Sequence, residues 1–277
     1  MINLRHQVCF AAKECRCYGR LPMRTTPDKT LLTWLGASDN MFATGEYPKR
    51  FEFNDEVARV FDDMVQRSIP LYQDVTEYVC DWALRYYQPG SWIVDIGCST
   101  GTAIAYVGQR MTGAGRFMGI DNAPAMIARA SSKLTAFPSR HELRMVCDDL
   151  FNVPLEPASV VIINYTLQFI PIAQRRRVLA MAYEALLPGG LLFVSEKVRS
   201  TCPRFQETVT GIYEGFKEQH GYSRTEIERK KEALDNVLVP LTEEQQRGLI
   251  TSVGFEFCES VIKWNNFLSL VALKDDA

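Results

Sequence analysis

The stretch Ile93-Val94-Asp95-Ile96-Gly97-Cys98-Ser99-Thr100-Gly101-Thr102 decides the fold of this chain. It begins with a short, mostly β-branched apolar run, which is typical of a buried parallel strand. Glycines then follow, where the backbone must tighten or approach a ligand closely. The spacing matches neither the G-x-G-x-x-G of a dinucleotide loop nor the G-K-[ST] ending of a P-loop. We therefore expect a ligand-binding turn between a strand and a helix, and no phosphate cradle.

A second strand with a polar end follows this turn. Residues 116–120 form another short apolar run, and Asp121 and Asn122 come directly after it. In doubly wound folds, an acid at the end of the second strand accepts hydrogen bonds from a ribose diol. The two units together predict an adenosine site.

Helix and strand patterns alternate along most of the chain. This alternation at short spacing demands right-handed parallel crossovers, and therefore a central parallel sheet. Near the C-terminus, two apolar runs are expected to form an antiparallel hairpin that closes one edge of the sheet. We expect helices at 73–87, 101–112, 123–134, 171–186 and 242–253, and strands at 93–96, 116–120, 143–147, 159–164, 191–195, 256–263 and 267–273.

Residues 198–239 interrupt the alternation. Phe205, Val209, Ile212, Tyr213 and Phe216 fall on one helical face, and a charged helix follows at 223–236, opened by a capping box. An insertion after the fifth strand lies over the carboxyl ends of the strands, where ligands bind. We interpret it as a lid or a dimer element, with extra core packing as the alternative.

Composition narrows the class of protein. The net charge is −2 over 277 residues, which argues against a nucleic-acid surface and favours a small-molecule substrate. The eight cysteines form no CxxC pair, so neither zinc nor disulfides are expected, and the default is a reducing cytoplasm. No apolar run is long enough for a membrane span. We expect no metal, no membrane contact and no direct nucleic-acid partner.

The glycine loop and the acid-ended second strand resemble the S-adenosylmethionine (SAM) site of class I methyltransferases. The resemblance implies an α/β fold, a Rossmann-like, seven-stranded, mostly parallel sheet with a helical lid insertion. Four segments follow: an N-terminal extension (1–50), a SAM-binding core (51–197), the lid insertion (198–239), and a C-terminal helix and hairpin that complete the core (240–277).

Each part of SAM needs a different partner. Asp121 suits the diol and Asn122 the adenine ring or ribose. Asp149 suits the adenine amino group with the Leu150 backbone beside it, and Asp148 competes for that role. Backbone groups of the loop suit the amino acid end, and Asp95 would orient the loop. Any of these acids could instead be a helix cap. The loop residues are Gly97, Cys98 and Ser99.

The segment after the fourth strand, which begins with Asn164 and Tyr165, should lie over the sulfonium. Aromatic contact with a cation contributes about 0.5–2 kcal/mol. No histidine is placed as a general base. The tyrosine candidates for contact with the sulfonium are Tyr72, Tyr165, Tyr213 and Tyr222.

Beyond the fold, the chain resembles the carboxy-SAM synthase family over about residues 39–275. That family joins the carboxylate of prephenate to the methyl carbon of SAM, giving carboxy-SAM for tRNA wobble-uridine modification, and forms homodimers. By position, the resemblance puts SAM contacts on Tyr72, Gly97, Cys98, Ser99, Asp121, Asn122, Asp149, Leu150 and Asn164. It rests on Asp39–Ala43, Phe53–Ala58, Phe61–Pro70, Asp95–Ser99, Asp121–Ile127, Asn164–Phe169, Ser195–Lys197 and Gly221–Ser223.

One position departs from the family pattern. Where the family has an arginine that binds the product carboxylate, this chain has Lys231, and a lysine offers a point charge in place of a planar fork. We expect Tyr72, Asn164, Tyr165 and Lys231 to serve the reaction. Carboxy-SAM synthesis is the first hypothesis. The alternatives are cyclisation of SAM to azetidine-2-carboxylate with release of methylthioadenosine, methylation of a small acceptor, or a silent SAM-binding subunit.

Overall fold

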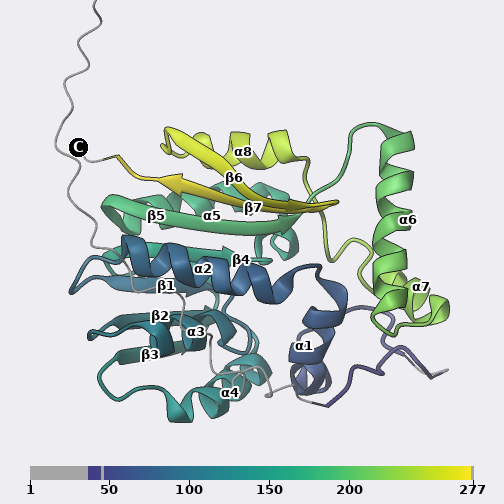
Figure 1. Cartoon of the computed structure of the whole chain (residues 1–277), viewed down its shortest axis with the longest axis horizontal. Helices are drawn as coiled ribbons and strands as arrows, with labels where there is room; N and C mark the ends of the chain where they lie inside the picture. Colours follow the sequence, from purple (N-terminus) through teal and green to yellow (C-terminus); the bar gives the residue numbers. More distant parts are fainter. Residues whose placement is uncertain (1–36, 45–46, 276–277) are drawn as a thin grey trace, which may run out of the picture.

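The computed structural model describes residues 37–44 and 47–275, and its centre is one twisted sheet (Figure 1). The strand order is β3-β2-β1-β4-β5-β7-β6. All neighbours from β3 to β5 are parallel, whereas β7 runs antiparallel to both β5 and β6. The predicted seven-stranded, mostly parallel sheet with a C-terminal hairpin is confirmed. The strands are β1 Trp92–Ile96, β2 Arg116–Asp121, β3 Glu142–Cys147, β4 Ala158–Asn164, β5 Leu186–Lys197, β6 Phe257–Trp264 and β7 Phe267–Leu273.

Helices pack on both faces of the sheet (Figure 1). Val75 and Val79 of α2 share one apolar cluster with Ile104 of α3. On the other face, Leu179 of α5 packs in a cluster with Ile250 of α8. The sheet is thus the middle of three layers, as an amphipathic α/β pattern requires. The helices are α1 Asp55–Ser68, α2 Tyr72–Tyr86, α3 Thr102–Arg110, α4 Pro124–Lys133, α5 Ile172–Ala185, α6 Pro203–Gln219, α7 Arg224–Ala233 and α8 Glu243–Thr251, with short 3-10 turns η2 Leu134–Ala136, η3 Leu150–Asn152 and η4 Leu167–Phe169.

Strand β1 fixes the position of the glycine loop. All five of its residues are buried, because it pairs with β2 on one side and β4 on the other. Asp95 lies opposite Gly119 and Ile162 in this register. The loop that starts at Gly97 therefore leaves the middle of the sheet at its carboxyl edge.

Helices α1, α6 and α7 gather at that same edge (Figure 1). Asn54 caps α1 through its side chain, which accepts from Val57 N at 3.0 Å. The predicted capping box of α7 is confirmed, with reciprocal bonds between Ser223 and Glu226. The insertion therefore covers the region where the strands end.

Two details of the sequence analysis need correction. The predicted apolar face of α6 is only partly covered, since Phe205 and Ile212 are 66% and 51% exposed. The helix meets the rest of the chain through Tyr213, whose hydroxyl donates to Ser68 O at 2.9 Å. Strand β5 begins at Leu186 rather than at residue 191, because an irregularity in its pairing with β4 takes in the Pro-Gly-Gly segment.

None of the helices in residues 37–44 and 47–275 is both long enough and apolar enough to cross a membrane.

Candidate functional site

A cavity of about 720 Å³ opens at the carboxyl edge of the sheet, beneath α1, α6 and α7. Its size suits a substantial organic ligand. Most of the residues predicted for the site line it. These are Tyr72, Asp95, Gly97, Cys98, Ser99, Asp121, Asn122, Asp149, Leu150, Asn164, Tyr165 and Lys231. These residues, which are far apart in the sequence, therefore converge on one cavity.

The glycine loop brings bare backbone to the cavity. Gly97 has a φ of +73°, which favours glycine, and a Cβ there would overlap the side chain of Thr166. The amides of Gly97 and Cys98 donate to the carbonyl of Ile120 at 2.8 and 3.0 Å. The loop is thereby tied to β2 and leaves no room for a side chain at its tightest point.

Asp121, rather than Asp95, holds the loop. Its carboxylate accepts from Ser99 N and from Ala123 N, both at 2.9 Å. The expectation that Asp95 orients the loop is not met, since no hydrogen bond joins its carboxyl to another residue that the structure describes. Asp121 still has lone pairs to offer a diol, because an ionised carboxylate has about four acceptor sites.

Burial raises the pKa of both Asp95 and Asp121. Desolvation raises the pKa of Asp95 to about 7, with the charge of Asp121 adding to the effect. It also raises the pKa of Asp121, against the two backbone hydrogen bonds that lower it. A positively charged ligand would stabilise the ionised form of Asp95.

The acids after β3 also contact their own turn. Asp149 accepts from Phe151 N at 2.9 Å and caps η3. Asp148 accepts from Asp149 N at 2.7 Å and from Asn152 Nδ2 at 3.0 Å. Helix capping and ligand contact were alternatives in the sequence analysis, but a carboxylate can do both, and both acids line the cavity.

Strand β4 ends in a polar atom without a partner. The Oδ1 atom of Asn164 is buried and makes no hydrogen bond to any residue that the structure describes, although such atoms are normally paired. Tyr165 follows with a φ of 59°, a left-handed conformation that is costly for a bulky residue. Its ring lies 6.3 Å from that of Tyr72, so these side chains form one wall of the cavity.

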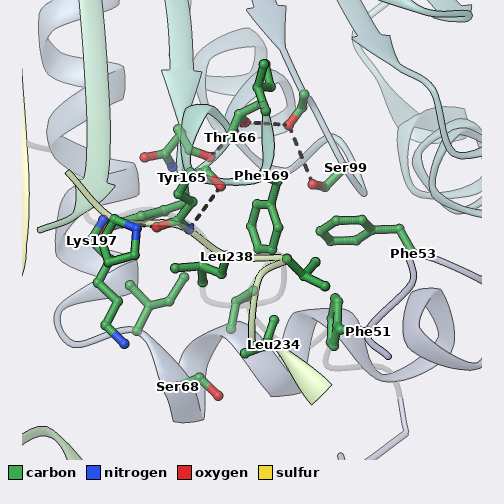
Figure 2. A pocket seen from close by; sticks show the side chains of 18 of the residues that line it. Phe51, Phe53, Ser68, Ser99, Tyr165, Thr166, Phe169, Lys197, Leu234 and Leu238 are labelled. Atoms are coloured by element: carbon green, nitrogen blue, oxygen red, sulfur yellow. Dashed lines mark hydrogen bonds between the residues drawn. The ribbon is translucent and has the colours of Figure 1, made fainter. Parts of the chain in front are cut away.

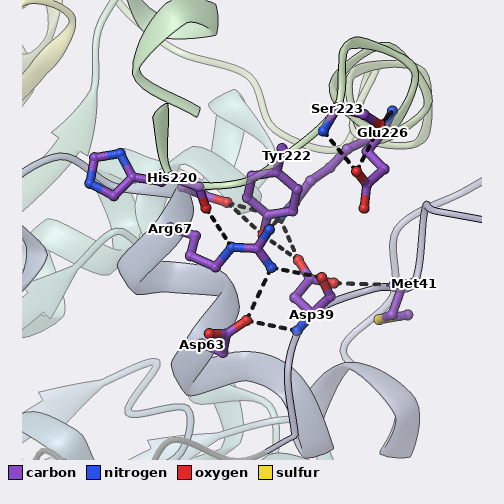
Figure 3. A network of polar contacts seen from close by, with 10 residues as sticks. Asp39, Met41, Asp63, Arg67, His220, Tyr222, Ser223 and Glu226 are labelled. Carbon is purple, nitrogen blue, oxygen red and sulfur yellow. Dashed lines mark hydrogen bonds and ion pairs between the residues drawn. The ribbon is translucent and has the colours of Figure 1, made fainter. Parts of the chain in front are cut away.

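The four tyrosine candidates separate into two groups. Tyr72, Tyr165 and Tyr213 line the cavity, but Tyr222 does not. The hydroxyl of Tyr222 instead bonds Asp39, and its ring stacks under the guanidinium of Arg67 at 4.0 Å (Figure 3). The prediction that Tyr222 contacts a ligand cation is therefore wrong, because Tyr222 joins the lid to the segment before α1.

Sequence reasoning missed an aromatic part of the wall. Phe51, Phe53 and Phe169 surround one side of the cavity with Leu234 and Leu238 (Figure 2). The rings of Phe53 and Phe169 meet edge to face at 5.1 Å. The sequence signal for this wall is the apolar pair Phe51 and Phe53, just before the N-cap residue Asn54. Such a pair is hard to distinguish from ordinary core packing.

Sequence reasoning also missed three of the four lysines that line the cavity. Lysine side chains come from the end of β5, from α6 and from α7, and Lys231 alone was predicted. In Figure 2, Lys197 lies on the far side of the view from Phe51 and Phe53. The four are Lys197, Lys217, Lys230 and Lys231.

The environments of these lysines differ. Burial lowers the pKa of Lys197 to about 8, of Lys217 to about 7 and of Lys230 to about 8. Lys231 is 66% exposed in its side chain, and its Nζ lies 3.3 Å from Glu214 Oε1. Arg229 does not line the cavity and donates to the backbone carbonyl of Phe42 at 2.9 Å.

A buried ion pair supports the loop from behind. Lys133 Nζ lies 2.8 Å from Asp62 Oδ1, and donates to the hydroxyls of Thr100 and Thr102 at 2.8 and 2.9 Å. Asp62 also accepts from the Thr100 hydroxyl at 2.7 Å. Helices α1 and α4 thereby hold the start of α3 in place.

The residues present fit SAM. Its amino and sulfonium groups are cationic and suit the buried Asp95, and an amine could donate to the orphaned Asn164 oxygen. The exposed loop backbone at Gly97 suits the amino acid end. The lysines that line the same cavity suit an anion.

Comparison with known proteins identifies close relatives. Residues 93–190 match the Methyltransferase domain family. A carboxy-S-adenosyl-L-methionine synthase of Trichodesmium erythraeum is 47% identical over 91% of this chain and 100% of that protein. The same enzyme of Shewanella pealeana is 37% identical over 86% of this chain and 99% of its own length. The magnesium protoporphyrin IX methyltransferase of Synechocystis, solved with bound SAH, superposes with a TM-score of 0.53 at 14% identity. The superposition covers 76% of this chain and 87% of that one, and it shows that the two proteins share a fold.

Proposed function

Since the chain belongs to the carboxy-S-adenosyl-L-methionine synthase family, we propose that it transfers the ring carboxylate of prephenate to the methyl carbon of SAM. It is a SAM-dependent enzyme of the class I methyltransferase fold. What is proposed is that prephenate is the carboxylate donor and that the new bond forms to the methyl carbon of SAM.

One observation carries the proposal beyond family membership. The cavity is lined both by acids beside the glycine loop and by four lysines that come from β5, α6 and α7. A cationic methyl donor and an anionic partner can therefore lie in one enclosed space with each charge facing its opposite. Holding two reactants in this way supplies much of the rate enhancement that enzymes achieve.

The overall reaction balances. The bond from the prephenate ring to its carboxylate breaks, and a new carbon–carbon bond joins that carboxylate to the methyl carbon of SAM. The methyl group gives up one proton, the ring loses its hydroxide, and the two leave as water. The remainder of prephenate is phenylpyruvate. SAM supplies an acidified methyl group because of its sulfonium, and the protein's part is to orient, to neutralise charge and to exclude bulk water.

The lysine at position 231 affects how the cavity can bind a carboxylate. A lysine cannot form the bidentate fork that an arginine offers, and Glu214 already neutralises this one at 3.3 Å. The three other lysines that line the cavity offer further positive charge. Positive charge for an anionic partner is therefore present even without the family arginine.

The two alternatives need different cavities. Cyclisation of SAM requires only a folded and shielded substrate, so the lysines would have no role in it. Transfer of a methyl group to a neutral acceptor would also leave them without a partner. The charge of the cavity supports an anionic second substrate over both.

Mass spectrometry of the protein with SAM, first alone and then with prephenate, tests the proposal. We expect a prephenate-dependent gain of one carboxylate on intact SAM. Methylthioadenosine and azetidine-2-carboxylate from SAM alone, above the background without enzyme, would instead establish cyclisation. A methylated acceptor would move the assignment to an ordinary methyltransferase.

A further inference from the structure

The lysines of the cavity are not all balanced by acids. Lys230 pairs with Asp39 at 3.3 Å, and Lys231 pairs with Glu214 at 3.3 Å. Within the described part of the chain, no carboxylate lies within 4.0 Å of the ammonium group of Lys197 or Lys217. Two ammonium groups without an acidic partner at ion-pair distance therefore line a cavity whose other residues fit SAM.

Lys197 and Lys217 each lie against the same ring. Lys197 ends β5 and Lys217 lies in the last turn of α6, yet each Nζ atom is 4.6 Å from the centroid of Tyr213. Tyr213 is anchored in turn, because its hydroxyl donates to Ser68 O at 2.9 Å. Both lysines line the cavity that a ligand would occupy.

Such a pair is unfavourable without a ligand. Lys217 is only 7% exposed, and burying an ammonium group disfavours its charged form. Burial is the main cause that lowers the pKa of each lysine, and their proximity lowers that of Lys217 further. The face of Tyr213 offsets part of this cost by cation–π attraction. An anion placed at both ammonium groups would offset it more fully.

We propose that Lys197 and Lys217 together form a binding site for a carboxylate of the second substrate, separate from the position of Lys231. This inference rests on the proposed function for the identity of that substrate. The pair can hold the carboxylate that stays on the donor or the one that is transferred, and in either case it orients the donor toward SAM. These two lysines are then substrate-binding residues of the reaction.

The proposal predicts a proton uptake that a structural role would not produce. At pH 8 Lys217 is mostly neutral before the anion binds, because its pKa lies near 7. A bound carboxylate raises that pKa, so the site takes up a proton as it fills. The charged groups that face Lys217 are Lys197 from β5, Lys230 and Lys231 from α7, and Glu214 from α6.

Calorimetry with prephenate tests the site directly. The enzyme is first saturated with S-adenosylhomocysteine, which lacks the methyl group and so prevents turnover. We expect Lys217→Met and Lys197→Met each to weaken prephenate binding at least tenfold, while Lys217→Arg, which keeps the charge, retains most of the affinity. Titration at pH 8 in buffers of different ionisation enthalpy should show proton uptake in the wild-type enzyme and less in Lys217→Met.

A matched control and a folding check accompany these variants. Lys263→Met removes an ammonium group that pairs with Glu243 at 2.7 Å outside the cavity, and prephenate binding should not change. Unaltered affinity for S-adenosylhomocysteine in all variants would show that the rest of the site is intact. If Lys217→Met fails to fold, Lys197→Met and Lys217→Arg still decide the question.

The outcomes separate this site from the proposed reaction. Equal prephenate affinity in the wild-type, Lys217→Met and Lys197→Met enzymes overturns the site, even where carboxy-SAM is formed. Proton release, or no exchange of protons, overturns it as well and favours a lysine that acts as a base. Weakened binding in the variants without any carboxy-SAM from the wild-type enzyme upholds the site and refutes the reaction.

Discussion

The buried pair of Lys133 and Asp62 should contribute far more to stability than an exposed pair of the same kind. Their side chains are only 7% and 10% exposed, and Nζ lies 2.8 Å from Oδ1. In Lys133→Met the Asp62 carboxylate stays buried without its counter-charge. Removing one partner of a buried pair typically costs about 3–5 kcal/mol. We expect the free energy of unfolding to fall by that amount.

The chain supplies a matched comparison for this substitution. Lys263 and Glu243 are 52% and 31% exposed, with a contact of 2.7 Å. Pairs exposed to solvent contribute about 0–1 kcal/mol. Lys263→Met removes the same chemical group at nearly the same distance, so burial is the main difference between the two experiments.

Urea unfolding followed by tryptophan fluorescence measures both variants. Adding Asp62→Asn to Lys133→Met removes the orphaned charge and should recover part of the loss. SAM affinity should also fall in Lys133→Met, because Thr100 and Thr102 lose the ammonium group that fixes them. Equal losses of stability in Lys133→Met and Lys263→Met would refute the reasoning that burial decides the contribution.

Three further predictions concern the SAM end of the cavity and Lys231. Gly97→Ala should weaken SAM binding at least tenfold in calorimetry. The alanine would have to adopt a left-handed backbone conformation, which costs roughly 1–2 kcal/mol, and its Cβ would clash with Thr166. Gly215→Ala is the control and should bind SAM normally, because a Cβ there meets nothing within 4 Å. Near pH 7, SAM binding should release protons that Asp95→Asn does not, because a bound cation favours the carboxylate of an acid whose pKa is about 7. In the free protein, the raised pKa of Asp95 stabilises the fold fully below about pH 4, and this contribution is lost as the pH rises through about 7. The unfolding free energy of Asp95→Asn should therefore depend less on pH between these values than that of the wild-type protein. Lys231→Arg should raise the yield of carboxy-SAM from prephenate, and an unchanged yield would argue against a carboxylate at that position.

The local sequence was sufficient to predict the sheet and the SAM end of the site. Strand β1 is an apolar run apart from Asp95, and β2 ends in an acid, so both strands follow from pattern alone. Carboxyl ends of adjacent parallel strands must meet at one edge. That geometry explains why Asp95, Asp121 and Asn164 converge although they are far apart in the chain.

The lysine end of the site could not be predicted in the same way. Lys197, Lys217 and Lys230 come from a strand end and two helices, and only the packing of the insertion brings them together. Nothing local distinguishes Lys217, at the end of a helix where a cation is ordinarily favourable, from a surface residue. The prediction for Tyr222 was wrong for the same reason, because its partners Asp39 and Arg67 lie far away in the sequence.

The central claim is that a carboxylate moves from prephenate to the methyl carbon of SAM. The most direct test uses prephenate labelled with ¹³C in its ring carboxylate, together with unlabelled SAM, and follows the label by NMR and mass spectrometry. The account predicts that the label appears in a SAM-derived product, bonded to the former methyl carbon, with one phenylpyruvate formed for each product. Label found only in carbon dioxide or in unreacted prephenate, while SAM is consumed, would contradict it.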